Sequence, residues 1–302
     1  MQYKLLYGFV WLVSLLPLCV LYALSDLMYF LIYYVVKYRR QVVLDNLTSA
    51  FPEKSAEEIR KIEKKFYSFF ADYIVETIKL CSISEKEIRR RMEFVGVDKM
   101  VSSLDSSGKN FAFLYLAHYC NWEWVSSMAL WIHDADAKVA AGQIYHPLKN
   151  PSFDRLFLKM RGKFDGDNIG MKETLRYILR KRQQDIPTII GFIADQAPKW
   201  NSIHHWTDFL HHKTPVFTGT EQIAKQVDAL VFYAHVERVK RGYYRCTITE
   251  VTDDVKAWPD YDLTDAYFRH LASTIQAEPA YWLWSHKRWK RTYEEFLERQ
   301  KH

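Results

Sequence analysis

From residue 110 onward, short apolar runs alternate with segments whose apolar residues recur at helical spacing. The apolar runs have the length and composition of buried strands, and they predict strands over residues 111–117, 138–145, 187–194, 229–237 and 243–251. The segments between them predict helices over residues 122–133, 152–162, 171–183, 218–227 and 263–277. This alternation predicts an α/β fold with a mostly parallel central sheet flanked by helices.

Before this region, residues 55–78 predict one long amphipathic helix. Ser55 and Glu58 form a capping box shortly after Pro52. Apolar residues then recur three or four positions apart as far as Ile78. We interpret this stripe mainly as a face of the core, with contact to a membrane surface as the alternative.

The chain begins with two uncharged apolar runs. Residues 5–24 are about as long as the ~30 Å hydrocarbon core of a bilayer requires, although Pro17 kinks the segment. Residues 27–36 follow, and the basic residues of 37–40 come directly after them. By the positive-inside rule this basic cluster marks the cytoplasmic side of a membrane. We therefore expect an N-terminal hydrophobic membrane-anchor helix within residues 1–40 and a globular domain over residues 41–302.

Two other interpretations of the N-terminal runs remain. A cleaved signal peptide is disfavoured, because Lys4 is the only early charge and no clear cleavage site follows. A buried helical hairpin of the core is the second alternative. The second run is compatible with a membrane span, a re-entrant segment or a helix lying in the interface.

The charge of +6 is mild, which gives no support to binding of nucleic acid. It is concentrated, however, because residues 149–182 hold ten Lys or Arg against four Asp or Glu. Such a segment suits phosphate, anionic lipid or an acidic protein. The four cysteines form no CxxC pair, and the histidines 204, 205, 211 and 212 lack a recognised metal-binding spacing. We therefore expect no metal and no cofactor.

Polar residues follow directly after two of the predicted strands. His118 comes after strand 111–117, and Asp195 with Gln196 comes after strand 187–194. Ligands of parallel sheets bind at the carboxyl ends of the strands, so this edge is the candidate site. We expect Asn121 to cap a helix and Glu123, in its first turn, to accept a hydrogen bond from the His118 imidazole. The other ring nitrogen would then act as a base; a purely structural turn is the alternative.

The stretch H-Y-C-N-W-E at 118–123 resembles the H-x4-D/E motif of glycerolipid-type acyltransferases. Four further blocks, at 46–53, 145–164, 192–196 and 278–292, resemble the ordered motifs of one family. That family is the bacterial late (lauroyl/myristoyl) acyltransferases of lipid A biosynthesis, in the lysophospholipid acyltransferase-like superfamily. The resemblance covers about residues 40–291.

The resemblance implies transfer of a fatty acyl chain from acyl carrier protein, or from acyl-CoA, to a hydroxyl of a lipid A precursor. It places the enzyme at the bacterial inner membrane with its catalytic domain on the cytoplasmic face. It implies His118 as general base, Glu123 as its orienting acid and Arg161 as a donor to the oxyanion, with Asp195 as a further catalytic residue. The residues implied in substrate binding are Asn121, Arg155, Lys159, Lys163 and Gln196.

Two positions depart from the family pattern. Ala197 replaces a frequent second acid, and His146 stands where an arginine is common. Either change points to a different acceptor, so an O-acyltransferase for another bacterial phospholipid, aminolipid or glycolipid is an alternative. A catalytically inactive, membrane-tethered lipid-binding protein is another. Near the end of the chain, basic residues suited to steering an acidic carrier protein are Lys287, Arg288, Lys290 and Arg291.

Overall fold

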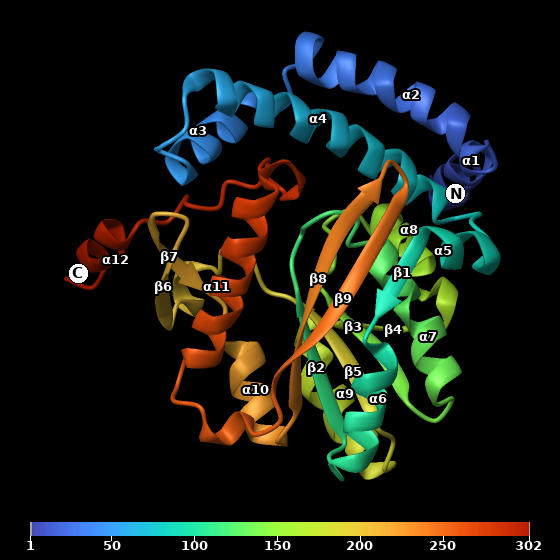
Figure 1. The fold of residues 1–302 in the computed structure, drawn as a ribbon, viewed down its shortest axis with the longest axis vertical. Helices are drawn as coiled ribbons and strands as arrows, with labels where there is room; N and C mark the ends of the chain where they lie inside the picture. The colour runs from blue at the N-terminus through green and yellow to red at the C-terminus, as the bar shows by residue number, and fades with distance from the viewer. Residues whose placement is uncertain (1, 302) are drawn as a thin grey trace.

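A seven-stranded sheet forms the centre of the protein in the computed structural model, which describes residues 2–301 (Figure 1). The strand order is β1-β9-β8-β2-β5-β3-β4. Neighbouring strands are parallel except for the pair β8–β9, which confirms the predicted mostly parallel α/β fold. The strands are β1 (Met92–Val95), β2 (Phe111–Leu116), β3 (Ala140–Tyr145), β4 (Asp167–Gly170), β5 (Thr188–Ile193), β8 (Leu230–Lys240) and β9 (Tyr243–Thr252).

The five strands predicted from apolar runs all form, and the strands missed are short or polar. β1 and β4 have four residues each and lie at the two edges of the sheet. Residues along β1 alternate between buried and exposed, and β4 has the sequence Asp-Asn-Ile-Gly. Neither strand therefore contains a continuous apolar run that would predict it. The separate hairpin of β6 (His205–Phe209) and β7 (His212–Val216) carries the clustered histidines.

The sheet is flanked by helices, as predicted (Figure 1). The segment expected as one helix over residues 122–133 is instead a 3-10 turn, η2 (Trp124–Ser127), followed by a helix that begins later. The helices around the sheet are α5 (Glu85–Arg91), α6 (Val97–Ser106), α7 (Met128–Ala135), α8 (Pro151–Arg161), α9 (Thr174–Gln183), α10 (Gly219–Val227) and α11 (Asp262–Ala277), with α12 (Tyr293–Arg299) near the C-terminus.

A layer of N-terminal helices lies across one end of the sheet (Figure 1). α3 (Arg40–Ala50) precedes α4 (Ala56–Lys79), and the predicted capping box of Ser55 and Glu58 is present at the start of α4. α1 (Gln2–Ser14) and α2 (Leu18–Phe30) lie along the outer side of α4, and α2 continues as a π-helix (Leu31–Val35). The outermost layer is therefore formed by the two apolar runs.

The uncharged run 5–24 is not one helix, in contrast to its predicted span. α1 ends at Ser14, and α2 begins after Pro17, whose ring cannot continue a helix. One helix among residues 2–301 is long and apolar enough to cross a membrane by length and composition, namely Leu18–Val35, with a mean hydropathy of 1.7. The candidate span therefore includes the second run.

Polar contacts hold α1 and α2 against the rest of the protein. The Ser25 hydroxyl donates to the buried Asp72 of α4 at 2.7 Å. The Lys79 ammonium donates to the carbonyl oxygens of Ser14 and Leu16 at 2.8 and 3.0 Å. Carbonyl groups at the end of a helix such as α1 have no intrahelical donor, and Lys79 supplies one. These bonds anchor the end of α1 and the middle of α2 to α4.

Candidate active site

His118 and Asp195 lie side by side because of the register between β2 and β5. Leu116 pairs with Ile193 at the carboxyl ends of these parallel strands. His118 and Asp195 each follow two residues later, so the two side chains emerge at the same edge. The prediction that both residues belong to one edge of the sheet is confirmed.

The imidazole of His118 is held by Asp195. The distance from His118 Nδ1 to Asp195 Oδ1 is 2.6 Å, and Asp195 Oδ2 accepts from the backbone N–H of His118 at 3.1 Å. Trp282 Nε1 donates to the same Oδ2 at 2.8 Å. Burial by itself raises the pKa of the Asp195 carboxyl, but the imidazole and these hydrogen bonds lower it below its usual value.

An ionised Asp195 fixes the tautomer of His118. A carboxylate only accepts hydrogen bonds, so the proton of the neutral imidazole resides on Nδ1. Nε2 then carries the lone pair, and the Gln196 amide nitrogen, 3.3 Å away, donates to it in this structure. The arrangement provides a buried acid, an oriented imidazole and a basic nitrogen.

The C-terminal segment clamps the turn that carries His118. The backbone N–H of Leu283 donates to the His118 carbonyl oxygen at 3.1 Å, and the N–H of Cys120 donates to the Tyr281 carbonyl oxygen at 2.9 Å. Cys120 has a φ of 51°, in the left-handed region that side chains rarely adopt. These contacts hold the turn in a conformation that the local sequence alone does not favour.

Glu123 does not hold the imidazole, which corrects the sequence-based expectation. Its carboxylate accepts two hydrogen bonds from Arg161, from Nε at 2.7 Å and from Nη2 at 2.6 Å. The Glu123 side chain is 2% exposed and that of Arg161 21%. Glu123 lies past the turn and extends toward the last turn of α8, whereas strand register brings Asp195 to His118.

This bidentate ion pair fixes the Arg161 guanidinium beside the site. Burial lowers the pKa of Arg161, and the charge of Glu123 more than offsets it, so the net shift is upward. Two parallel N–H···O bonds also restrict the plane of the guanidinium. Glu123 therefore positions Arg161, and Asp195 positions His118.

A cavity of about 760 Å³ opens beside these residues. His118, Glu123, Arg161 and Gln196 all line it. Below them it continues between one face of the sheet and α7, which contributes Met128, Ala129 and Ile132. The site thus joins a basic nitrogen to a deep, mainly apolar space.

Strand register arranges the sheet wall of the cavity in levels. Parallel partners point to the same face, so Leu116 and Ile193 form the level nearest His118. Leu114 and Gly191 form the next level, and Ile189 lies deepest. Gly191 has no side chain to fill the middle level, which keeps the cavity continuous.

The other residues predicted to bind substrate lie away from the cavity. Asn121 is fully buried; its Oδ1 accepts from the Trp124 N–H at 3.1 Å and its Nδ2 donates to Glu76 at 2.7 Å. The helix that it was predicted to cap does not begin at Trp122; Asn121 instead accepts from the first residue of η2, whose N-cap is Glu123. Neither end of its amide faces the cavity, so Asn121 supports the turn.

Three basic residues predicted to face substrate contact the N-terminal layer instead. The Arg155 guanidinium lies over the Tyr3 ring, 4.5 Å from its centroid, and the Lys159 ammonium lies 3.8 Å from that of Tyr7. The Lys163 ammonium donates to the backbone carbonyls of Leu80 and Cys81. Arg155 and Lys159 share α8 with Arg161, and Lys163 lies in the 3-10 turn that follows it; the three contact α1 and the end of α4 instead of the cavity.

Several residues in or near the site were missed by the sequence interpretation or given another role. Gly191 was missed because it lies in the middle of a strand. The hydrogen bond from Trp282 to Asp195 was missed because only the fold brings these two distant parts of the sequence together. Arg288 is fully buried and donates to the Pro215 carbonyl oxygen, so it is not part of a docking surface. Lys290 and Arg291 line the cavity.

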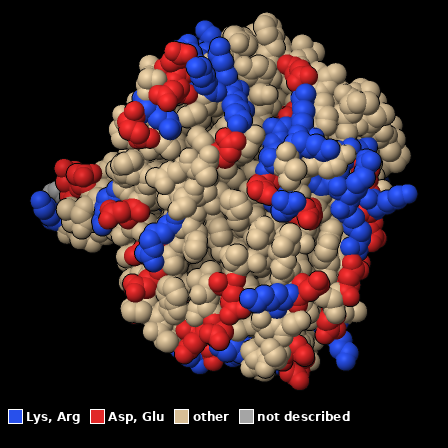
Figure 2. All heavy atoms as spheres, in the orientation of Figure 1, with Lys and Arg blue, Asp and Glu red and all other residues tan. Residues whose placement is uncertain are grey.

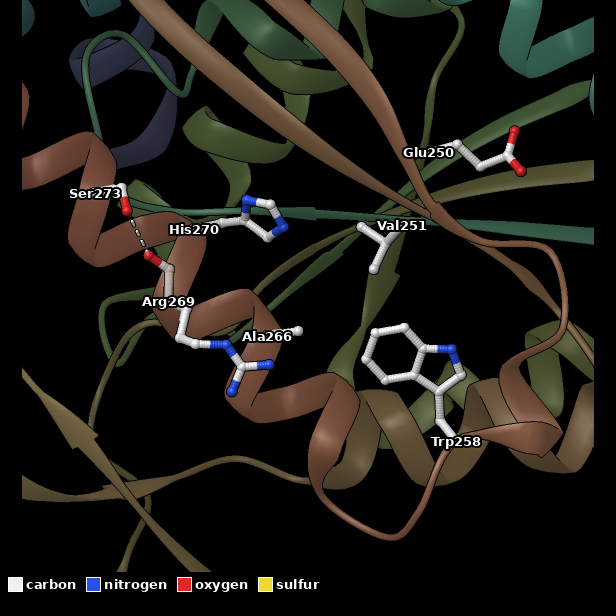
Figure 3. A pocket seen from close by; sticks show the side chains of 7 residues that line it. All are labelled: Glu250, Val251, Trp258, Ala266, Arg269, His270 and Ser273. Atoms are coloured by element: carbon white, nitrogen blue, oxygen red, sulfur yellow. Dashed lines mark hydrogen bonds between the residues drawn. The ribbon is translucent and has the colours of Figure 1, made fainter.

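A second hollow of about 410 Å³ lies between β9, the loop at Trp258 and α11 (Figure 3). Since β9 runs antiparallel to β8, Glu250 and Val251 lie toward the opposite end of the sheet from His118. Figure 3 shows His270 and Ser273 on α11, where the Ser273 hydroxyl donates to the Arg269 carbonyl oxygen. Within residues 2–301, no group of three His, Cys, Asp or Glu side chains is arranged to hold a metal ion.

Comparison with known proteins identifies the family. The model of the family described as bacterial lipid A biosynthesis acyltransferase matches residues 2–291. The chain belongs to the bacterial lipid A biosynthesis acyltransferases. The comparison with curated proteins found no match.

A lipid A biosynthesis acyltransferase transfers acyl groups, which confirms the reaction class implied by the motifs. The match covers nearly the whole chain and includes α1 and α2 as well as the residues around the cavity. The N-terminal layer therefore belongs to the family's own sequence. An acyltransferase of lipid A uses an acyl donor and a lipid acceptor.

Proposed function

We propose that the protein transfers a fatty acyl chain from a thioester donor to a hydroxyl of a lipid A precursor, with His118 as general base. The observation that carries the proposal is the apolar cavity that begins at His118 Nε2 and extends between the sheet and α7. A thioester carbonyl at its mouth would lie beside the base while its acyl chain fills the apolar depth. Family membership supports the same reaction.

The chemistry requires a group that carries a proton and donors that stabilise an oxyanion. His118 Nε2 takes the proton of the acceptor hydroxyl while the oxygen attacks the thioester carbonyl carbon. The tetrahedral oxyanion collapses, the carbon–sulfur bond breaks, and the leaving thiolate takes the proton from Nε2. Asp195 stabilises the positive imidazolium formed between these steps. No covalent acyl-enzyme is needed.

Arg161 and Gln196 are the proposed oxyanion donors. Both line the cavity beside His118, and Glu123 fixes the Arg161 guanidinium. Preorganised donors of this kind stabilise developing charge more than mobile ones. The donor substrate is acyl carrier protein or acyl-CoA, since both present the acyl group as a thioester.

The absence of a side chain at Gly191 is proposed to let the acyl chain reach the deepest level of the cavity, at Ile189. Ile193 to Ile189 spans four strand residues, or about 13 Å, which at about 1.3 Å per extended carbon accommodates roughly ten carbons. A Cβ at Gly191 would meet Leu116 Cδ2 at 3.4 Å and the Gly142 carbonyl oxygen at 3.8 Å, so the backbone tolerates a side chain. That side chain would occupy the middle level of the cavity.

The test is acyl transfer by the purified protein to lipid A precursor and to alternative acceptor lipids, from acyl carrier protein and CoA donors of increasing chain length. The wild-type protein should transfer to the lipid A precursor. Gly191→Val should shift the preferred donor about four or five carbons shorter, and Gly191→Ala should shift it less. Transfer only to another bacterial lipid would favour the alternative acceptor; lipid binding without transfer would favour an inactive protein.

We propose further that the enzyme resides at the bacterial inner membrane, with its catalytic domain on the cytoplasmic face and α1 and α2 in contact with lipid. Large apolar side chains of these helices are exposed, among them Leu5, Phe9 and Leu12 at 68%, 68% and 62%. Figure 2 shows a mostly uncharged surface over this part of the molecule. The bonds of Ser25 and Lys79 favour helices that lie along the membrane rather than detach from α4.

Replacing Leu5, Phe9 and Leu12 together with serine should abolish flotation with vesicles containing anionic phospholipid. The melting temperature should change little, because these side chains face outward. A matched control replaces the exposed apolar residues Val95, Leu179 and Leu297, which lie on other elements. Equal flotation of the first variant and the wild-type protein would contradict the assignment of this face to the membrane.

A further inference from the structure

The mouth of the cavity carries more positive charge than its own carboxylates can balance. Besides Arg161, the cationic side chains that line it are Lys172, Lys199, Lys290 and Arg291. Glu123 is the one carboxylate residue lining it within residues 2–301, and Arg161 already pairs with it. None of the four other cations forms an ion pair with a carboxylate within the described part of the chain.

Arg291 shows most clearly that a partner is missing from this cluster. Its Nε and Nη1 are buried and make no hydrogen bond, although the guanidinium lies 5.6 Å from the centroid of the Trp200 ring. An unmade hydrogen bond at a buried donor costs free energy, so native proteins usually pair such groups. The neighbouring His286 likewise has a buried, unpaired Nε2.

The cations also repel one another. Burial is the largest cause that lowers the pKa of Lys290, and the charges of Arg291, Arg288 and Arg39 lower it further. The pKa of His286 falls to about 4, mainly through burial and then through Lys290. His286 is therefore neutral near pH 7 and adds no further positive charge. An anion between these groups would remove the repulsion.

We propose that Lys290, Arg291 and Lys199 form a binding site for a phosphate group of the substrate at the mouth of the catalytic cavity. Phosphate carries up to two negative charges and several acceptor oxygens, which suits a fork-shaped guanidinium flanked by ammonium groups. A carboxylate would leave more of the cluster uncompensated. The inference rests on the proposed function, since the anion shares its cavity with His118.

The position of the site defines the class of ligand. An anion held at the mouth while the apolar depth takes a hydrocarbon chain describes an amphiphilic substrate with a phosphate near its reacting group. The phosphate belongs to the acceptor lipid's headgroup or to the phosphodiester arm of the thioester donor. Both present the same oxygens, so kinetics must separate them.

The experiment compares wild-type protein with the Lys290→Gln/Arg291→Gln variant in acyl transfer. The KM for the phosphate-bearing substrate should rise at least tenfold with a smaller change in kcat, because the lost contact is made in both ground and transition states. If KM rises only for the acceptor, and does not rise for dephosphorylated acceptor, the bound phosphate is that of the acceptor headgroup. A rise confined to the donor assigns its phosphodiester. Unchanged KM values for both substrates would overturn the proposal.

The control variant removes two positive charges outside the cavity. Lys86→Gln/Lys138→Gln changes two exposed lysines that do not line the cavity, and it should leave both KM values unchanged. An equal rise of KM in this control would show that the effect comes from the net charge of the protein, and it would contradict a specific site.

A binding measurement separates this inference from the proposed reaction. Inorganic phosphate should raise the melting temperature of the wild-type protein and of the control, but not of Lys290→Gln/Arg291→Gln. If phosphate stabilises only proteins with an intact cluster while no acyl transfer occurs, the site stands and the reaction assignment fails. If transfer occurs and phosphate stabilises all three proteins equally, the reaction stands and the site fails.

Discussion

Replacing His118 with alanine should lower kcat for acyl transfer by about 10²- to 10⁴-fold, the usual contribution of a positioned general base. The imidazole is partly exposed to the cavity and contributes little to the core, so the fold should persist. His118→Gln, which retains a polar side chain of similar size, should lose comparable activity. Substrate binding should change less than turnover, because the acyl chain contacts the apolar walls.

The measurement is the steady-state rate of acyl transfer together with the melting temperature of each variant. His204→Ala, at an exposed residue outside the cavity, is the control and should match the wild-type rate. A His118→Ala protein that stays folded and keeps a rate within about threefold of wild type would remove the base assignment. If it loses structure, His118→Gln provides the test.

The pH dependence of this rate near neutral pH should contain no contribution from Asp195. The pKa of Asp195 lies below its usual value, so this carboxyl is ionised throughout the neutral range. Its contribution to stability is present above the unfolded-state pKa of about 3.9 and is lost only as the pH falls through the lower folded-state pKa. A decline of kcat/KM on acidification near neutral pH therefore does not reflect protonation of Asp195.

The sequence predicted the edge of the sheet at which chemistry takes place, because apolar runs are local signals. The run 111–117 predicts a buried strand, and His118 follows it whatever the rest of the fold does. Asp195 follows the run 187–194 for the same reason. Two strand ends in one parallel sheet share an edge, so their joint placement was predictable.

Which carboxylate contacts His118 was not predictable from local sequence. Glu123 is five residues away along the chain, whereas Asp195 becomes a neighbour only when β2 pairs with β5 in one register. Trp282 and Arg291 reach the site from the end of the chain through contacts such as the hydrogen bond from Leu283 to His118. Nothing in the periodicity of a segment encodes such long-range pairing.

The short edge strands and the broken N-terminal helix have a related cause. β1 and β4 are too short and too polar to show a period. The run 5–24 has the composition of a span, but Pro17 and the capping of the Ser14 carbonyl by Lys79 end the first helix there. Tertiary contacts, and not composition, decide where such a run bends.

Asp195→Asn should lower kcat by about 10²- to 10⁴-fold while leaving the KM values nearly unchanged. An amide at this position offers an N–H to His118 Nδ1, which moves the ring proton to Nε2 and leaves no lone pair there for the acceptor hydroxyl. It also removes the negative charge that stabilises the imidazolium. The loss should therefore appear in turnover and not in binding of the acyl chain.

The matched comparison is Glu123→Gln. It makes the same change from carboxylate to amide at the residue that the sequence motif predicted as the hydrogen-bond partner of His118. This variant should release Arg161 from its bidentate pair, leave a mostly buried guanidinium uncompensated, and cost about 3 kcal/mol of unfolding free energy. Its activity loss should arise from a misplaced Arg161, so the protonation of His118 should stay as in wild type. Arg161→Met in the same chain should recover part of the stability and none of the activity.

Nitrogen chemical shifts of labelled histidine distinguish the two variants directly. In wild type and in Glu123→Gln, the neutral imidazole of His118 should carry its proton on Nδ1, because Asp195 accepts from that nitrogen. In Asp195→Asn the proton should move to Nε2. If Glu123→Gln alone changed the tautomer, the carboxylate acting on His118 during turnover would be Glu123, and the Asp195 contact would be a feature of the substrate-free protein only.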